Sequence, residues 1–183
     1  MNSIVTFPNR IPTTEFEERR FKVYTDRQLD KIEVIQNLPE ETLFEMKVVA
    51  SVLPFRVNEY VINELINWDK VPNDPIYQLV FPQKGMLKEE HYERMATMHR
   101  EGADKKEIQA VAKEIRDELN PHPAGQMEMN MPELDGEVLD GVQHKYRETV
   151  LFFPAQGQTC HSYCTFCFRW AQFVGDKDLK MAS

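Results

Sequence analysis

The sequence predicts an α/β protein in which a helical N-terminal layer is followed by a buried strand and a cysteine-rich loop. Apolar side chains recur at helical spacing in several segments between residues 24 and 119. Residues 150–153 form a continuous apolar run, as expected for a strand buried on both faces of a parallel sheet. Between them, residues 120–143 are rich in turn formers and predict an irregular connector. We therefore divide the chain into a helical region with its connector, residues 1–143, and a second region, residues 144–183.

The helical segments follow one another with recognisable boundaries. Residues 24–38 predict a first helix, and Pro39 is expected as the first residue of a second, with Glu40 and Glu41 in its first turn. Pro54 is expected to end that helix. The apolar stripes of these two helices consist of Leu29, Ile32, Ile35 and Leu38, then Leu43, Phe44, Val48, Val52 and Leu53.

Three further helices are expected before the connector. The first, at residues 57–68, carries Val57, Tyr60, Val61, Leu65 and Trp68 as its stripe. The second, at 87–100, is closed by Gly102 in a C-terminal cap, and Asp104 and Glu107 form a capping box for the third, which continues to residue 119. The histidines His91, His99 and His122 lack metal-ligand spacing and are predicted to face solvent or cap helices.

The length, composition and net charge of the chain exclude several classes of protein. The chain has 183 residues and 42% apolar residues, which is enough for one packed core with or without an appendage. A net charge of -8 argues against a nucleic-acid surface, because such a surface needs a basic field. No apolar run approaches the roughly 18 residues of a membrane span, so no membrane partner is expected.

The cysteines indicate the cellular compartment. The N-terminal residues lack the basic and apolar regions of a secretory signal, and the chain has 3 cysteines, an odd number. Both observations favour a reducing compartment, and we expect the cytoplasm.

All three cysteines, Cys160, Cys164 and Cys167, lie in the stretch "TCHSYCTFCFRW". A disulfide would leave one thiol unpaired, and buried structural cysteines rarely gather in this way. A structural zinc ion normally needs a second, distant pair of ligands to complete a tetrahedron. The remaining interpretation is an iron–sulfur cluster held by three thiolates, whose fourth iron stays open to a small molecule.

The spacing Cys-x3-Cys-x2-Cys resembles the signature of the radical S-adenosylmethionine (radical SAM) superfamily. That resemblance implies a 4Fe-4S cluster whose open iron binds S-adenosylmethionine, and a reductive cleavage that yields a 5′-deoxyadenosyl radical. It implies an incomplete radical SAM TIM-like barrel, with residues 150–153 as its first strand, and barrel enzymes keep their sites at the carboxyl ends of the strands. It also implies that Phe166 packs on the adenine.

Within the superfamily, residues 144–175 and the element "VPNDPIYQLVFP" are similar to lysine 2,3-aminomutase. The resemblance implies a PLP-dependent 1,2-amino migration on an amino acid, lysine or a related one. It implies that Arg169 binds the substrate carboxylate, a task suited to its planar fork, and that Lys145 lies near the phosphate of pyridoxal phosphate. It further implies a flavodoxin- or ferredoxin-type electron donor and a homo-oligomer.

The sequence departs from that family at several points. Thr149 and Thr165 stand where the family has arginines, so a substrate other than lysine is an alternative. The lysine that binds pyridoxal phosphate in the family falls outside this chain, so we expect a fragment or a truncated product that is catalytically incomplete. Two alternatives stay open: a radical SAM enzyme without pyridoxal phosphate, and a non-catalytic iron–sulfur or zinc protein.

Overall fold

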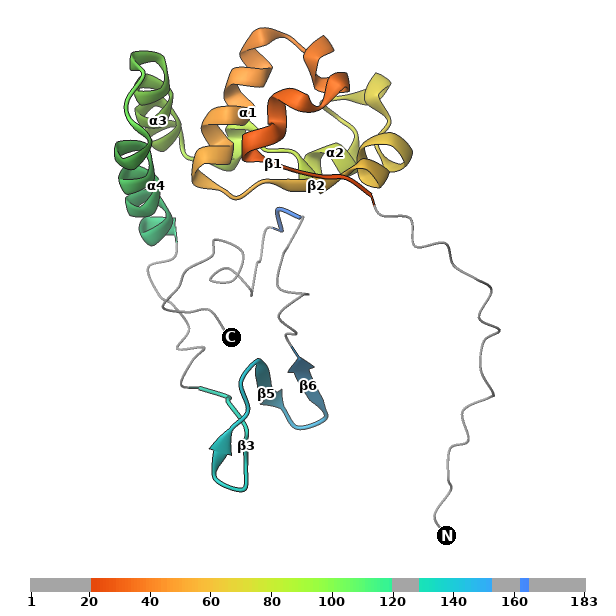
Figure 1. Ribbon diagram of the computed structural model, residues 1–183, viewed down its shortest axis with the longest axis vertical. Coiled ribbons are helices and arrows are strands. Elements are labelled where there is room, and N and C mark those ends of the chain that lie inside the picture. The colour runs from red at the N-terminus through yellow and green to blue at the C-terminus, as the bar shows by residue number, and fades with distance from the viewer. Residues whose placement is uncertain (1–20, 120–128, 153–161, 165–183) are drawn as a thin grey trace.

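The computed structural model describes residues 21–119, 129–152 and 162–164. Residues 21–119 form a layer of helices bordered by a short two-stranded sheet, and residues 129–152 form two small hairpins (Figure 1). The sheet at the border pairs β1 (Val23–Thr25) with β2 (Arg56–Asn58) in antiparallel register, so that Tyr24 faces Val57.

The predicted helix at residues 24–38 is wrong in type. Two 3₁₀ helices, η1 (Asp26–Lys31) and η2 (Glu33–Asn37), occupy this segment and are separated by an extended residue, Ile32. The apolar residues recur every third position, which is the period of a 3₁₀ helix and not the 3.6 of an α-helix. The expected side chains are nevertheless buried, namely Leu29, Ile32 and Ile35.

Helix α1 (Glu40–Val52) is the centre of the helical layer. Pro39 is its N-cap residue, one position earlier than expected, and the helix ends before Pro54 as predicted. Met46 and Ala50 enter one apolar cluster with the 3₁₀ helices and β2, whereas Val48, Val49 and Val52 enter a second cluster. The helix is buried on two sides because it separates these two parts of the core.

The single helix expected at residues 57–68 is also wrong. The chain forms β2, a π-helical turn η3 (Val61–Leu65) and a 3₁₀ turn η4 (Trp68–Lys70) instead. Tyr60 and Leu65 of the predicted stripe are exposed, and Ile62 and Ile66 are buried in their place. The pairing of β2 with β1 holds the start of the segment extended, so a continuous α-helix cannot form there.

Helix α2 (Pro75–Val80) was not predicted as a helix, although its start carries a Pro at the first position and an Asp before it. The short 3₁₀ turn η5 (Lys84–Met86) connects it to the second cluster.

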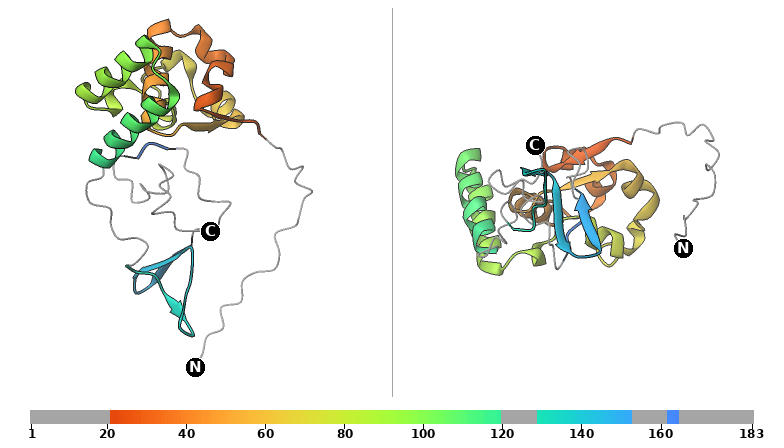
Figure 2. Two further views of the ribbon diagram at one scale, coloured as in Figure 1. Left: turned by 60° about the vertical axis from the view of Figure 1, so that its left-hand side comes forward. Right: turned by 90° about the horizontal axis from the view of Figure 1, so that it is seen from below.

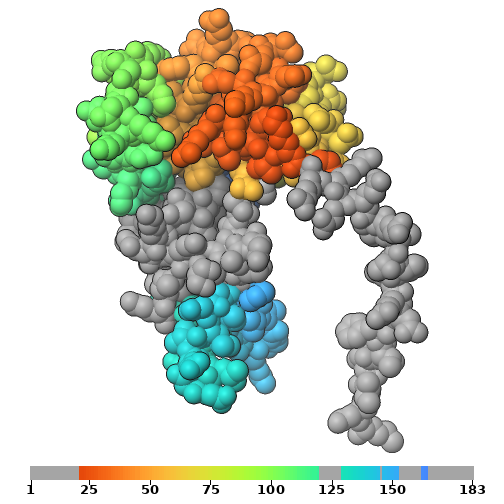
Figure 3. Space-filling view, viewed as in Figure 1, coloured from red at the N-terminus to blue at the C-terminus, as the bar shows by residue number. Residues whose placement is uncertain are grey.

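Helices α3 (Glu89–Glu101) and α4 (Lys105–Leu119) form an antiparallel hairpin beside α1 (Figure 3, green). Gly102 adopts the left-handed conformation with φ 69°, and the amide of Ala103 donates to the carbonyl of Met98 at 3.0 Å. Asp104 Oδ1 accepts from the amide of Glu107 at 3.0 Å, while Glu107 Oε2 accepts from the amide of Asp104 at 3.1 Å. The predicted cap and capping box are therefore confirmed.

The last part of the predicted connector contains regular structure. Strands β3 (Glu133–Leu134) and β4 (Glu137–Val138) form a hairpin whose turn residues, Asp135 and Gly136, both have positive φ. Strands β5 (Val142–Tyr146) and β6 (Thr149–Phe152) form a second hairpin with Val142 opposite Phe152.

Strand β6 lies where a strand was expected, within one residue. It pairs antiparallel with β5, and all four of its residues are exposed, Phe152 at 69%. Among the described residues the hairpin has no third strand, so membership of a barrel stays a prediction.

Candidate functional site

Most of the predicted site residues fall outside the described part of the chain. Of the cysteine motif, Ser162, Tyr163 and Cys164 are described, and Cys164 is a free, exposed cysteine. Lys145 lies in β5, of which only the backbone is described at that position. The predicted residues outside the described ranges are Cys160, Phe166, Cys167 and Arg169.

Tyr163 joins the cysteine motif to the helical layer. Its phenol donates a hydrogen bond to the carbonyl of Pro54 at 3.0 Å, and its amide donates to the carbonyl of Leu79 at 2.8 Å. The ring packs against the second apolar cluster, and burial raises the pKa of Tyr163 well above its ordinary value. The segment 162–164 (blue) accordingly lies next to the helical layer in Figure 1 and in the turned view of Figure 2, left.

Both carbonyl groups that accept hydrogen bonds from Tyr163 lie at the ends of helices. The carbonyl of Leu79 belongs to the last turn of α2, where carbonyls have no partner within the helix. Pro54 follows the C-cap residue of α1. Tyr163 therefore satisfies backbone groups that the helices themselves leave unpaired.

Asp74 fixes the position of α2. Its Oδ1 accepts from the amides of Ile76 at 2.9 Å and Tyr77 at 2.8 Å, and its Oδ2 accepts from the amide of Asn67 at 3.1 Å. Only 5% of Asp74 is exposed, and these bonds, that of Tyr77 first, lower the pKa of the carboxyl below its ordinary value. The carboxylate thus caps α2 and ties it to the preceding 3₁₀ turn.

Four aromatic rings connect Pro54 and Leu79, the two residues whose carbonyls accept hydrogen bonds from Tyr163. Phe55, next to Pro54, has its ring centroid 5.3 Å from that of Phe81, two residues after Leu79. Phe81 stacks on Tyr77 at 5.2 Å, and Trp68 meets both rings edge-on at 5.6 and 6.0 Å. Aromatic pairs at such distances resist relative movement of their elements. We call Pro54, Phe55, α2 and Phe81 the docking platform.

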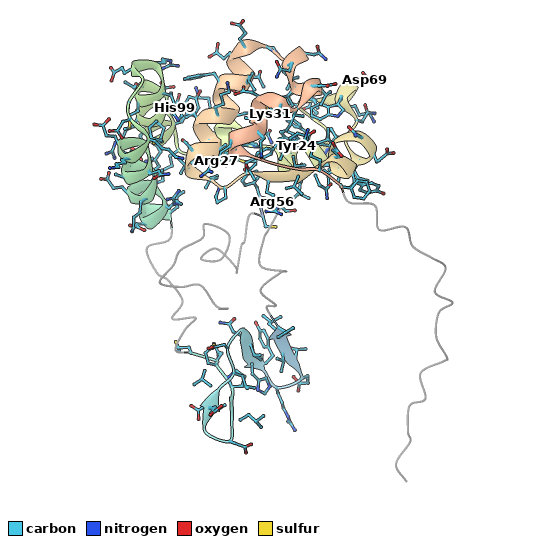
Figure 4. All side chains as sticks on the ribbon, viewed as in Figure 1. Tyr24, Arg27, Lys31, Arg56, Asp69 and His99 are labelled. Carbon is cyan, nitrogen blue, oxygen red and sulfur yellow. The ribbon has the colours of Figure 1, made fainter. Side chains whose placement is uncertain are left out.

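β2 brings a positive charge to this side of the layer. Arg56 follows Phe55, and Figure 4 shows it below β2, on the side where segment 162–164 lies.

Among the described residues, one group of three metal-ligating side chains lies close enough to share an ion, namely Glu90, His91 and Glu118. His91 Nε2 lies 3.2 Å from Glu118 Oε1, and His91 is 7% exposed. Of its two predicted positions, the one in solvent is therefore wrong, and the helix-capping alternative stays a prediction. Lys88 Nζ already lies 2.9 Å from the same oxygen of Glu118 and 3.9 Å from Glu90. This ammonium supplies the positive charge, and we interpret the group as an ion-pair cluster that joins α3 to α4.

His99 is likewise less accessible than predicted. It points from α3 toward α1 (Figure 4), its Nε2 is 3.2 Å from Ser51 Oγ, and its ring meets Phe44 edge-on. Burial lowers the pKa of His99. His122 lies outside the described residues.

Comparison with known proteins found no family model, no curated protein and no solved structure that matches this chain. No helix in the described part of the chain is long and apolar enough to cross a membrane. Any functional assignment therefore depends on the residues themselves.

Proposed function

We propose that this chain is the N-terminal part of a radical SAM enzyme of the aminomutase-like type, which holds a 4Fe-4S cluster and acts on an amino acid with pyridoxal phosphate. The observation that carries the proposal is the spacing of Cys160, Cys164 and Cys167 in a chain without other cysteines. Three thiolates fit a cluster that keeps one iron open, whereas a structural zinc ion would lack a fourth ligand.

The donor chemistry of the described segment supports this assignment. Cys164 is exposed and free, so its thiolate is available to a metal. The segment follows a strand, β6, and Tyr163 holds it against the helical layer. When bound, the cluster supplies the electron that cleaves the sulfonium bond of S-adenosylmethionine.

The remaining roles follow the resemblance. The three cysteines hold the cluster, Phe166 packs on the adenine, Arg169 binds the substrate carboxylate and Lys145 contacts the phosphate of pyridoxal phosphate. A bidentate pair between a guanidinium and a carboxylate orients the substrate as well as binding it. The electron donor is then a flavodoxin or ferredoxin, and the compartment is the cytoplasm.

A second candidate is a radical SAM enzyme without pyridoxal phosphate. Thr149 and Thr165 stand where the aminomutase family has arginines, and this loss of positive charge favours the second candidate. Equilibrium binding of pyridoxal phosphate to a longer chain that includes the downstream residues separates the two, because the first candidate needs the lysine that binds pyridoxal phosphate, and the second does not.

The first experiment is anaerobic reconstitution with iron and sulfide. We expect about four iron and four sulfide ions per chain, in line with a four-iron cluster, with a broad absorption band in the visible range. Cys164→Ala should lose the band, and the matched control Thr159→Ala, in the same segment, should keep it. In a chain long enough to be active, reduction in the presence of S-adenosylmethionine should release 5′-deoxyadenosine.

Two results would contradict the proposal. Stoichiometric zinc without sulfide would identify a zinc-binding protein. A cluster that forms but never cleaves S-adenosylmethionine, even in a longer chain, would identify a non-catalytic iron–sulfur protein.

A further inference from the structure

We propose that the docking platform sets the position of the cysteine loop, and that Tyr163 and Asp74 are positioning residues for the metal-binding site. This inference rests on the proposed function for what the loop holds. Its geometric part, that segment 162–164 is docked by these residues, stands on the described contacts alone.

The first step is the attachment of the loop. Tyr163 lies between the first two cysteines and directly before Cys164, and it has two hydrogen bonds to the helical layer, at 3.0 and 2.8 Å. Its ring also packs on the second apolar cluster. A displacement of Tyr163 is passed to Cys164 through a single peptide unit, which is planar and stiff.

The second step is the rigidity of what it attaches to. One acceptor, the carbonyl of Leu79, belongs to a helix of only 6 residues, and such a short helix is marginal without a cap. Asp74 supplies that cap with two bonds and ties the helix to Asn67 with a third. Loss of the Asp74 carboxylate therefore frays the helix that holds the amide of Tyr163.

The third step is the link between Pro54 and Leu79, whose carbonyls accept the two hydrogen bonds from Tyr163. Phe55 is next to Pro54, and Phe81 is two residues after Leu79, so the contact between their rings joins Pro54 and Leu79 in one packed unit. The side chain of Tyr77, in α2, is buried and stacks on Phe81. Because both carbonyls belong to this unit, the phenol and the amide of Tyr163 are held by one body. Two hydrogen bonds to one body fix the orientation of Tyr163, which one hydrogen bond alone would not impose.

This gives the element "VPNDPIYQLVFP" a mechanical role. Its Asp-Pro start caps α2, and its end supplies the carbonyl and the aromatic ring that hold the loop. The helical layer thus acts as the support of the metal-binding loop although none of its side chains is a cluster ligand.

The test compares three variants of the full chain, Tyr163→Phe, Asp74→Ala and the control Asp104→Ala. Asp104 also caps a helix with two bonds, but α4 does not carry an acceptor of Tyr163. The first measurement is amide hydrogen exchange of residues 162–164 in the metal-free protein. Tyr163→Phe and Asp74→Ala should exchange about five-fold or more faster there, as expected for loss of at least one net hydrogen bond, and Asp104→Ala should not.

The second measurement is made on reconstituted protein. The two platform variants keep all three cysteines and should still take up iron and sulfide, but the electron paramagnetic resonance spectrum of the reduced cluster should differ from that of the wild type. The spectrum of Asp104→Ala should match the wild type. A spectral change separates positioning from a loss of stability, which would reduce the cluster content and leave the spectrum of the remainder unchanged.

Each result of the two measurements supports or overturns one part of the proposal. Unchanged exchange of residues 162–164 in both platform variants overturns the docking. Faster exchange with an unchanged spectrum overturns the positioning role. If the wild type takes up no cluster at all, the proposed function fails, and the exchange rates alone decide whether the platform docks the loop.

Discussion

Asp74 and His99 show how single side chains in the helical layer respond to burial in opposite ways. Asp74 is charged when buried, because three backbone amides donate to its two oxygens. His99 receives no such compensation, and burial favours its neutral form. Both groups make the folded state bind fewer protons than the unfolded state in the acidic range, so both make stability fall as the pH is lowered.

His99 gives a pH prediction with a definite sign. Its pKa is lowered on folding from the ordinary value of 6.5, so the unfolded chain binds the proton more readily. The free energy of unfolding should therefore fall as the pH decreases from about 6.5 toward the lower pKa of the folded state. Chemical denaturation between pH 7.5 and 5.5 measures this.

The matched variants are His99→Gln and His144→Gln. His99→Gln should flatten the pH dependence, whereas His144→Gln, at an exposed position in β5, should leave it unchanged. A wild-type stability that is constant across this range would contradict the burial argument.

Arg169 is the residue through which the aminomutase resemblance is tested most directly. In the proposed enzyme its guanidinium binds the substrate carboxylate, and a lysine cannot reproduce the two parallel hydrogen bonds. Charge-assisted bonds of this kind contribute about 1.5–3 kcal/mol. In a chain long enough to be active, Arg169→Lys should raise the dissociation constant for the amino acid about ten-fold or more, with the cluster spectrum intact. Retained affinity, or loss of the cluster, would contradict the assignment.

At the scale of elements, the boundaries of α3 and α4 follow from local signals. Gly102 has φ 69° and open space where a side chain would begin, so the cost of a larger residue there is backbone strain alone. Gly102→Ala should destabilise the protein by about 1–2 kcal/mol. Gly85 also has open space and no positive φ, so Gly85→Ala should be neutral or slightly stabilising.

Urea denaturation of the two glycine variants makes the comparison. Equal effects at both positions would mean that the left-handed cap does not determine the end of α3. The capping box that follows is an independent signal for the start of α4, so we expect α4 to keep its N-terminus when Gly102 is replaced.

The sequence predicts best those parts of the fold that depend on contacts between residues close together in the chain. The caps at Gly102 and Asp104 involve neighbours in the chain, and they were predicted correctly. The segment at 24–38 was predicted as an α-helix although its apolar spacing of three residues favours a 3₁₀ helix. Helix α2 carries a local signal for its start, Asp74 followed by Pro75, but its 6 residues are too few to show a helical period.

Contacts across the chain explain the rest. The bond from Tyr163 to Pro54 spans 109 residues, and no periodicity or cap signal in the sequence indicates it. The burial of His91 depends on the packing of α3 against α4, since a histidine at the start of an amphipathic helix is compatible with either face. Of the candidate site, the sequence predicts the ligand residues, and the docking of their loop requires the tertiary structure.

At the scale of the whole chain, the described residues fall into two kinds. Residues 21–119 bury two apolar clusters that share α1, so this part has its own core. The hairpins of residues 129–152 instead carry most of the strongly exposed apolar side chains, among them Leu134, Tyr146, Val150 and Phe152. Stability and self-association should therefore depend on different regions.

The separation predicts that association can be removed without loss of stability. Strand β6 exposes Val150, Leu151 and Phe152, and within the described hairpin only one of its edges is paired. An apolar strand with an open edge is a template for pairing with a second copy. The wild type should therefore associate as its concentration rises in sedimentation velocity. Phe152→Lys should shift this association to higher concentration, because a charge on an edge strand opposes such pairing.

The thermal midpoint of the Phe152→Lys variant should stay at the wild-type value, because Phe152 contributes to neither core cluster. The matched control is Tyr60→Lys, which places the same charge at an exposed aromatic of the helical layer, 44% accessible, and should leave association unchanged. A wild type that stays monomeric at every concentration would contradict the open-edge mechanism. Equal loss of association in both variants would instead mean that the effect is not specific to the edge of β6. A change in net charge would not explain that loss, since each substitution moves the charge from -8 toward zero by one unit and so weakens the repulsion between copies.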